Sequence, residues 1–110
     1  MSIAARLVSD YIALHNAPTR EGIAALFTAD FAVFGTSIPE EGLRGDGYLR
    51  FLESLQGTSF VQEPGSDLLV DEQGRLVLRW VLTRADARLA SGVDYFTLQD
   101  GKINRVVGVY

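Results

Sequence analysis

The sequence predicts an α+β fold, because helical patterns fill its first half and strand patterns fill its second half. Three amphipathic stretches come first, and strand-rich segments joined by short turns follow them. Helices that precede consecutive hairpins favour an antiparallel sheet with helices on one face, not alternating βαβ units. A chain of 110 residues can bury one modest hydrophobic core, so we expect residues 1–110 to form a single domain.

The three helices are indicated by apolar side chains at helical spacing. Residues 2–16 carry such a stripe, and the helix should end before Pro18, which disfavours helix in the residue that precedes it. Thr19 is a natural N-cap for a second helix over residues 20–28. A third helix is expected over residues 46–55, with an apolar stripe made of Tyr48, Leu49, Phe51, Leu52 and Leu55.

The second half of the chain is expected to form strands, together with one short strand between the second and third helices. The expected strands are residues 31–34, 59–63, 67–71, 75–84, 89–98 and 102–110. Asp100-Gly101 separates the last two, and Asp-Gly between two β-rich runs is a strong hairpin signal because both turn residues need positive φ. Alternation along the strands places Trp80, Phe96 and Leu98 on the helix-covered face.

The opposite face of the predicted sheet is half apolar, and no helix is left to cover it. Apolar surface of this kind is typical of an interface with another subunit. We therefore expect a homodimer formed through this open face, with contacts from Val77, Arg79, Val81 and Tyr95.

Composition argues against several classes of function. The net charge is −4 with no run of like charges, so neither nucleic acid nor an anionic membrane surface is an expected partner. The chain has no cysteine and one histidine, so we expect no disulfide and no metal site. No nucleotide fingerprint or nucleophile elbow occurs, and we expect no cofactor. With no pattern typical of a signal peptide or a membrane span, the expected location is the cytoplasm.

One acidic residue breaks the apolar pattern of the predicted sheet. Asp94, Phe96 and Leu98 share one face of their strand, because side chains alternate along a strand. A carboxylate in such company either faces water at the rim of the sheet or lies in an apolar pocket. An apolar pocket would raise the pKa of this carboxyl group. The sequence leaves both positions open.

Two further side chains in the first helix could carry chemistry. Tyr11 lies on its apolar stripe, and His15 follows one turn later, so the two side chains can touch. By itself, Tyr11 is typical of a core aromatic residue whose hydroxyl finds a partner at the edge of the core. A single histidine near a helix end is typical of a cap or surface residue, and Trp80 of a core residue.

The sequence resembles the nuclear transport factor 2-like superfamily, which includes ketosteroid isomerases and SnoaL-like polyketide cyclases. The resemblance rests on residues 11–17 leading into residues 22–30, on residues 43–45 before the third helix, and on residues 100–103 before the last strand. It covers nearly the whole chain. It implies a cone-shaped fold, in which a strongly curved antiparallel sheet wraps around three N-terminal helices and encloses an apolar pocket.

The resemblance also implies roles for particular residues. Matched to the ketosteroid isomerases, Tyr11 falls on the tyrosine that donates to the substrate oxyanion, and Asp94 falls on the protonated aspartic acid beside it. The catalytic base of those enzymes falls at Gly35, and glycine cannot transfer a proton. Matched to the SnoaL-like cyclases, Asp94 becomes the acid–base residue, with Tyr11 or His15 as its helper.

We therefore expect a protein that binds a small molecule in a pocket. If it is an enzyme, we expect a cofactor-independent isomerase or cyclase. Such an enzyme would polarise a carbonyl or enolate oxygen with Tyr11 and Asp94, and His15 is a candidate base. The expected ligand is small and apolar, or polycyclic, and is contacted by Trp80, Phe96, Phe34, Phe51 and Leu14. Two alternatives stay open: a non-catalytic domain that binds a small apolar ligand, and a dimerisation module with a vestigial pocket.

Overall fold

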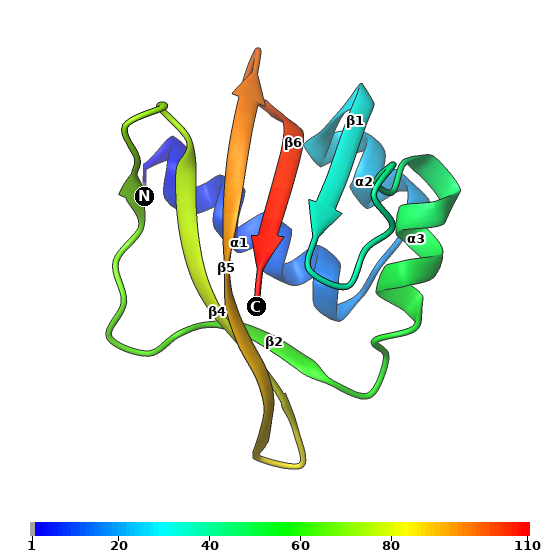
Figure 1. The fold of residues 1–110 in the computed structure, drawn as a ribbon, viewed down its shortest axis with the longest axis vertical. Coiled ribbons are helices and arrows are strands. Elements are labelled where there is room, and N and C mark those ends of the chain that lie inside the picture. The colour runs from blue at the N-terminus through cyan, green and yellow to red at the C-terminus, as the bar shows by residue number, and fades with distance from the viewer. Residues whose placement is uncertain (1) are drawn as a thin grey trace.

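Three helices lie against one side of a six-stranded sheet in the computed structural model, which describes residues 2–110 (Figure 1). The helices are α1 (Ile3–Asn16), α2 (Arg20–Leu26) and α3 (Gly45–Glu53). The strands are β1 (Phe27–Gly35), β2 (Ser59–Gln62), β3 (Leu69–Val70), β4 (Leu76–Arg84), β5 (Ala87–Gln99) and β6 (Lys102–Val109). The predicted α+β class is confirmed.

The sheet is mixed, which corrects the expectation of a wholly antiparallel sheet. Its strand order is β1-β6-β5-β4-β2, and β3 pairs with the free part of β4. Every pair is antiparallel except β1 with β6, which run parallel. The four strands from β3 to β6 each pair with the next strand in the chain as antiparallel hairpins, but β1 and β6 are separated by most of the chain. Their direction is therefore set by long-range packing, for which the local sequence carries no signal.

The helix ends follow the capping residues of the sequence. The Ser2 side chain accepts a hydrogen bond from the Ala5 amide at the start of α1, and Thr19 does the same for Gly22 at the start of α2. Helix α2 is shorter than expected, because Phe27 already belongs to β1 and pairs with Ile103. The expected strand over residues 31–34 is correspondingly the second half of a longer strand.

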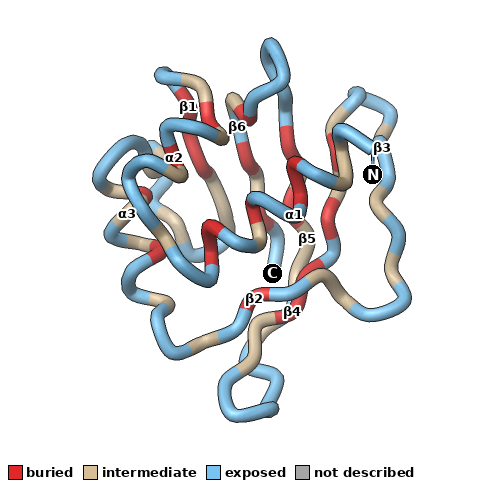
Figure 2. Tube along the Cα trace, turned by 180° about the vertical axis from the view of Figure 1, so that it is seen from behind, coloured by how far each residue is buried: buried red, intermediate tan, exposed pale blue. Residues whose placement is uncertain are grey.

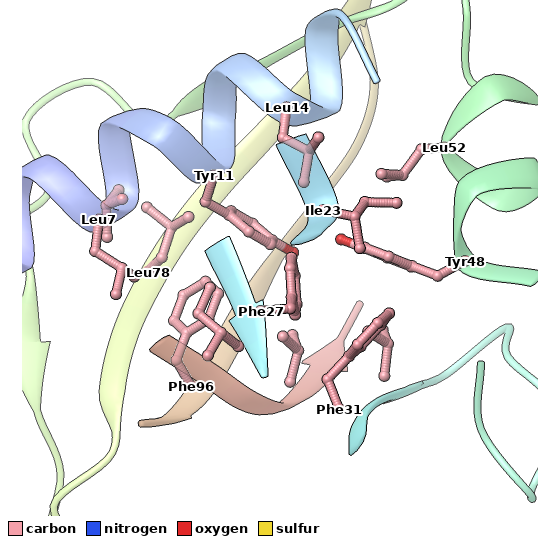
Figure 3. Packing of buried hydrophobic residues seen from close by; sticks show 14 of the residues in the cluster. Leu7, Tyr11, Leu14, Ile23, Phe27, Phe31, Tyr48, Leu52, Leu78 and Phe96 are labelled. Carbon is pink, nitrogen blue, oxygen red and sulfur yellow. The ribbon is translucent and has the colours of Figure 1, made fainter. Parts of the chain in front are cut away.

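The core lies between the helices and the concave face of the sheet. Buried positions cluster along the middle of the strands and on the inner sides of the helices (Figure 2). In Figure 3, Leu7 of α1 points toward Leu78 of β4, and Tyr11 lies over Phe96 of β5. Trp80 and Phe96 are on the covered face, as predicted, with 7% and 0% of their surface exposed.

Two apolar residues differ from their predicted exposure. Leu98 was expected under the helices but is 41% exposed, because it lies beside the turn at the end of the sheet, where the register with β6 shifts. Val81 was expected on the open face, yet it is only 3% exposed. It belongs to β4, and at this residue β4 pairs with β2 on one side and with β5 on the other. No helix within residues 2–110 combines the length and apolar character needed to cross a membrane.

Candidate functional site: a cavity beside a buried carboxylate

A cavity of about 230 Å³ lies between α1, α3 and the concave face of the sheet. Its walls are mostly aliphatic and aromatic, and they include residues of β1, β2, β4, β5 and β6. Two of the lining residues, Ser37 and Tyr110, are exposed to solvent. Among the described lining residues there is no lysine or arginine, and the side chains with polar atoms are Tyr11, His15, Ser37, Tyr48, Trp80, Asp94 and Tyr110.

The cavity owes its space to glycines on the concave face. We call the cross-strand set Gly35, Gly108, Asp94 and Leu78 the glycine row, which runs across β1, β6, β5 and β4. A Cβ atom built on Gly108 would lie 2.9 Å from Asp94 Oδ1, and one on Gly35 would lie 3.3 Å from Ile38 Cδ1. A side chain at Gly108 would therefore fill the space beside the carboxylate, whereas one at Gly35 would meet the Gly108 carbonyl oxygen and Ile38.

Two donors from different elements hold the Asp94 carboxyl group. The Tyr11 hydroxyl of α1 donates to Oδ2 at 2.7 Å, and the Trp80 indole N–H of β4 donates to Oδ1 at 3.0 Å. Gly92 makes the second contact possible, because a Cβ atom there would lie 2.6 Å from Trp80 Cζ2. Asp94 itself is 6% exposed and lines the cavity, which is the pocket position of the two that the sequence left open.

The electrostatics of Asp94 reflect burial without a nearby cation. Burial raises the pKa of Asp94 to about 6, and the hydrogen bonds from Tyr11 and Trp80 partly offset this rise. An ionised carboxylate only accepts hydrogen bonds, so the two donors match the charged form. Burial, with the Asp94 charge as a further cause, raises the pKa of Tyr11 well above its ordinary value. Tyr11 therefore stays protonated and remains a donor.

Two other polar side chains of the cavity have no hydrogen-bond partner among the described residues. The Tyr48 hydroxyl is buried and unpaired, and in Figure 3 it points from α3 toward Tyr11. Both ring nitrogens of His15 are also unpaired. Burial raises the pKa of Tyr48 above its ordinary range and lowers the pKa of His15 to about 3. Both groups are therefore uncharged at neutral pH.

The His15 ring is held by aromatic neighbours. It stacks on Phe60 with ring centroids 4.0 Å apart, and it meets the edge of Tyr11 at 4.7 Å, the one-turn contact that the sequence predicted. Phe60 is fixed in turn by Asn16, whose side-chain amide bonds to the Phe60 carbonyl and amide, both at 2.8 Å. His15 is thus a buried cavity wall, not the cap or surface residue that its position suggested.

Most of the residues expected at the site line the cavity. Those that do are Tyr11, His15, Phe34, Phe51, Trp80 and Asp94. Phe96 does not, because it lies beneath the Tyr11 ring with centroids 4.7 Å apart. Leu14 does not either, because it faces α2, where a Cβ atom on Gly22 would lie 2.9 Å from its Cδ1. The structure therefore places these two residues in the core beside the cavity and not in its wall.

Sequence reasoning missed three residues of the site. Tyr48 was placed on the apolar stripe of the third helix, but nothing in that stripe distinguishes a tyrosine that lines a cavity from one in the core. Phe60 and Gly108 belong to strands whose pairing was unknown. Within residues 2–110, no cluster of histidine, cysteine or carboxylate side chains could hold a metal ion.

Comparison with protein-family models finds no match, and none of the curated proteins matches the chain. Solved structures do match. A SnoaL-like family protein from Agrobacterium tumefaciens is 20% identical over 99% of this chain and 97% of its own, with a TM-score of 0.80. A protein from Kribbella flavida, described provisionally as a ketosteroid isomerase, is 26% identical over 97% of this chain and 76% of its own, with a TM-score of 0.70. The Δ5-3-ketosteroid isomerase of a Mycobacterium species is 19% identical over 100% and 94%, with a TM-score of 0.72.

These likenesses extend over nearly the full chain, and they agree with the resemblance found in the sequence. At these identities they establish the architecture. The chain has the cystatin-like α+β fold shared by SnoaL-like proteins, ketosteroid isomerases and nuclear transport factor 2-like proteins.

Proposed function

We propose that the protein binds a small uncharged carbonyl compound in the cavity and moves a proton on it with Asp94, as a cofactor-independent isomerase or cyclase. The single observation that carries this proposal is a buried carboxylate that faces a cavity and is held by two donors. A general base works best when its pKa lies near the working pH, and the pKa of Asp94 is raised to about 6.

The proposed step starts from the ionised form of Asp94. The carboxylate removes a proton from the carbon next to the ligand carbonyl, so the C–H bond breaks, an O–H bond forms, and the electron pair becomes an enolate. In a ligand whose enolate is conjugated with a C=C bond, the neutral acid then returns its proton to the far carbon of the dienolate, so the double bond shifts and the ligand is isomerised. In a cyclase the enolate carbon instead attacks a second carbonyl of the same ligand: a C–C bond forms, the C=O π bond breaks, and the resulting alkoxide takes the proton from Asp94.

The developing enolate oxygen needs a donor. The sequence assigned this role to Tyr11, but its hydroxyl is engaged with Asp94 at 2.7 Å in the free protein. We assign Tyr11 to positioning the carboxylate. We assign the donor role to Tyr48, which lines the cavity and whose enclosed hydroxyl has no partner in the free protein and must turn toward the ligand. A buried donor aimed at a developing oxyanion contributes about 3–4 kcal/mol to the transition state.

Deuterium exchange tests this function. The bicyclic ketone 1-tetralone is incubated with the protein in D2O, and loss of its C2 proton signal is followed by NMR. Asp94→Asn should lower the protein-catalysed rate by about 10²–10⁴-fold, because an amide cannot accept the proton. Asp10→Asn, an exposed change on the same helix as Tyr11, is the matched control and should keep the rate. Equal rates in the wild type and Asp94→Asn would refute the proposal.

A pH profile sharpens the role of Tyr11. The wild-type exchange rate should rise with pH through about 6, as Asp94 loses its proton. Tyr11→Phe removes a hydrogen bond that lowers the pKa of Asp94, so the midpoint of the profile should move to higher pH. An unchanged midpoint would remove Tyr11 from the positioning role.

A non-catalytic binding domain is the second candidate function. One observation favours it: the glycine row carries a single carboxylate, because Gly35 stands where the resembled isomerases carry their base. A binding domain would take up 1-tetralone in a calorimetric titration but exchange none of its protons. The same glycine predicts that the protein is a poor isomerase of 5-ene steroids.

We also propose that the protein forms a homodimer through the open face of the sheet. Val77 and Tyr95 are half-buried there, Arg79 is exposed, and the Arg75 guanidinium lies 4.5 Å from the centroid of the Tyr95 ring. Val81 is excluded from this interface, since it is already buried in one chain. Light scattering at micromolar concentration should give twice the mass of one chain, and a monomer would count decisively against the proposal.

A further inference from the structure

The two oxygens of the Asp94 carboxyl group differ in their surroundings. Oδ2 accepts a hydrogen bond from the Tyr11 hydroxyl, and Oδ1 accepts one from the Trp80 indole N–H. A Cβ atom built on Gly108 would lie 2.9 Å from Oδ1, whereas Oδ2 is not among the three atoms nearest to that position. Gly108 lines the cavity, so the free space beside the carboxyl group adjoins Oδ1.

An ionised carboxyl oxygen can accept two hydrogen bonds, so Oδ1 keeps one free acceptor position besides the bond from Trp80. Because the space over Gly108 adjoins this oxygen, Oδ1 is the atom that a C–H group of a bound ligand can approach.

The Trp80 ring is held by two aromatic neighbours and a glycine. Its ring centroid lies 5.3 Å from that of Phe60 and 5.5 Å from that of Tyr110. Gly92 pairs with Trp80 across β4 and β5, and a Cβ atom there would lie 2.6 Å from Trp80 Cζ2. The indole can therefore lie over Gly92 and reach Asp94, two residues further along β5. These contacts give the indole N–H a fixed direction.

We propose that Trp80 is a positioning residue whose indole N–H fixes the rotation of the Asp94 carboxyl group, and that Oδ1 is the atom that takes the proton from the ligand. The proposal rests on the proposed function for the proton transfer itself. In that step the ligand C–H bond breaks, an Oδ1–H bond forms, and the electron pair stays on the ligand as the enolate. Oδ2 keeps its hydrogen bond from Tyr11 before and after the transfer.

Exchange of the 1-tetralone protons in D2O separates the roles of the two donors. Rates are compared at saturating ketone on the high-pH plateau, where Asp94 is ionised in every variant and only its placement differs. Trp80→Phe should lower the plateau rate by about 10–100-fold, because a misplacement of about 1 Å can cost 100-fold. Tyr11→Phe should lower it less, since Trp80 still orients Oδ1. An equal or larger loss in Tyr11→Phe, or a Trp80→Phe plateau equal to that of the wild type, would overturn the inference.

Val81→Ala controls for lost packing in the same strand. Val81 follows Trp80 on β4 and is 3% exposed, and it points to the opposite face because side chains alternate along a strand. This variant should keep the wild-type plateau rate. A loss as large as that of Trp80→Phe would show that the rate responds to packing in β4, and the inference would be wrong.

The hydrogen bond from Trp80 can also be measured without turnover. Trp80 is the single tryptophan of the chain, so its indole N–H gives one signal in a nitrogen–proton correlation NMR spectrum. That signal should titrate with the same midpoint as the Asp94 carboxyl carbon, and it should not do so in Asp94→Asn. In Trp80→Phe the midpoint of Asp94 should rise by about one unit, because a hydrogen bond that lowers its pKa is lost. An indole signal that does not titrate, or an unchanged midpoint, would overturn the inference.

Other groups do not confuse this titration. The remaining titratable side chains that line the cavity are Tyr11, His15, Tyr48 and Tyr110. Burial raises the pKa of Tyr11 and Tyr48 and lowers the pKa of His15 to about 3, so these three are uncharged near the midpoint of Asp94. A wild type that exchanges no protons would refute the proposed function and the Oδ1 assignment together. Exchange in the wild type with a normal plateau in Trp80→Phe would refute this inference alone.

Discussion

Two neighbouring rows of residues, each paired across the same strands on one face of the sheet, differ in their side chains and in their packing. We call the first the filled row; it crosses β1, β6, β5 and β4 and consists of Val33, Val106, Phe96 and Leu76. All four side chains are at most 5% exposed. The glycine row lies two residues further along the same four strands and places two glycines beside a carboxylate. The filled row is part of the hydrophobic core, and the glycine row forms part of a cavity wall that contains a reactive group.

The difference teaches how a change of side chains along the same strands turns core into a cavity wall. The same paired strands run beneath both rows, and helices cover both. What changes is the absence of side chains at Gly35 and Gly108 and the presence of one polar side chain, Asp94. The filled row supplies stability from close packing, whereas the cavity beside the glycine row also contains His15 and Tyr48, whose buried polar atoms have no partners. The variants below test this division between stability and function.

Truncation of the filled row should have the largest effect. Phe96→Ala removes a side chain that is fully buried under Tyr11, and it should lower the free energy of unfolding by about 3–5 kcal/mol. Urea denaturation followed by circular dichroism measures this change. Leu89→Ala, at a residue that is 50% exposed, is the control and should cost far less. Similar losses in both variants would show that the filled row is not the stabilising part of the face.

The burial of His15 in the cavity wall should make the stability of the folded protein sensitive to acid. The folded protein holds the pKa of His15 at about 3, below the ordinary value of 6.5, so the unfolded chain binds the proton more readily. Stability from this group is complete above pH 6.5 and falls as pH drops toward 3. Between pH 7 and pH 4 the wild type should lose about 3 kcal/mol that His15→Phe retains.

Asp94 titrates in the opposite sense within the same window. Its pKa is raised from 3.8 to about 6, so its contribution to stability is greatest below pH 3.8 and is lost as pH rises through 6. Because Asp94 is present in both the wild type and His15→Phe, its effect cancels in their difference. A difference that does not change between pH 7 and pH 4 would show that His15 is accessible to protons in the folded protein.

The sequence predicted the filled row better than the glycine row. Helix caps at Ser2 and Thr19 and the alternation around Trp80 are local signals, and they gave the class, most elements and the covered face. The i to i+4 spacing also brought Tyr11 and His15 together correctly. The parallel pairing of β1 with β6 is not local, and for that reason the expected antiparallel sheet was wrong.

The residue that lies opposite Asp94 in the β5–β6 hairpin could not be predicted from the sequence. Counting back from the two-residue turn at Asp100-Gly101 would place Val107 opposite Asp94. The register shifts after Leu98, where Asn104 has no partner, and Gly108 takes that place instead. A side chain would have occupied the cavity at this point. One irregularity in the hairpin therefore decides whether the carboxylate faces space or packing, and no residue pattern marks it.

Refilling the glycine row should cost less than emptying the filled row. Gly108→Ala places a Cβ atom 2.9 Å from Asp94 Oδ1, so the carboxyl group must move, and we expect a loss of about 1–3 kcal/mol. Gly35→Ala is the matched variant on the next strand, where the nearest atoms are 3.1 and 3.3 Å away, and it should cost less. Chemical denaturation of both variants gives the order. A larger loss in Gly35→Ala would contradict the assignment of Gly108 as the space beside the carboxylate.

Adding a second carboxylate to the glycine row should have the smallest of these effects when it is measured as a change in the pKa of Asp94. Gly35 and Asp94 flank Gly108 in register, so Gly35→Asp places its carboxyl group on the same face, two strands from Asp94. Strands lie about 4.8 Å apart, so two strand spacings separate the carboxyl groups by about 10 Å, and like charges at this separation should raise the pKa of Asp94 by about one unit, or 1.4 kcal/mol. Carbon-detected NMR titration of the carboxyl groups measures the shift, with Gly35→Asn as the uncharged control of equal size. A shift in Gly35→Asp alone would show that the two positions share one low-dielectric space, and equal values in both variants would show that they do not.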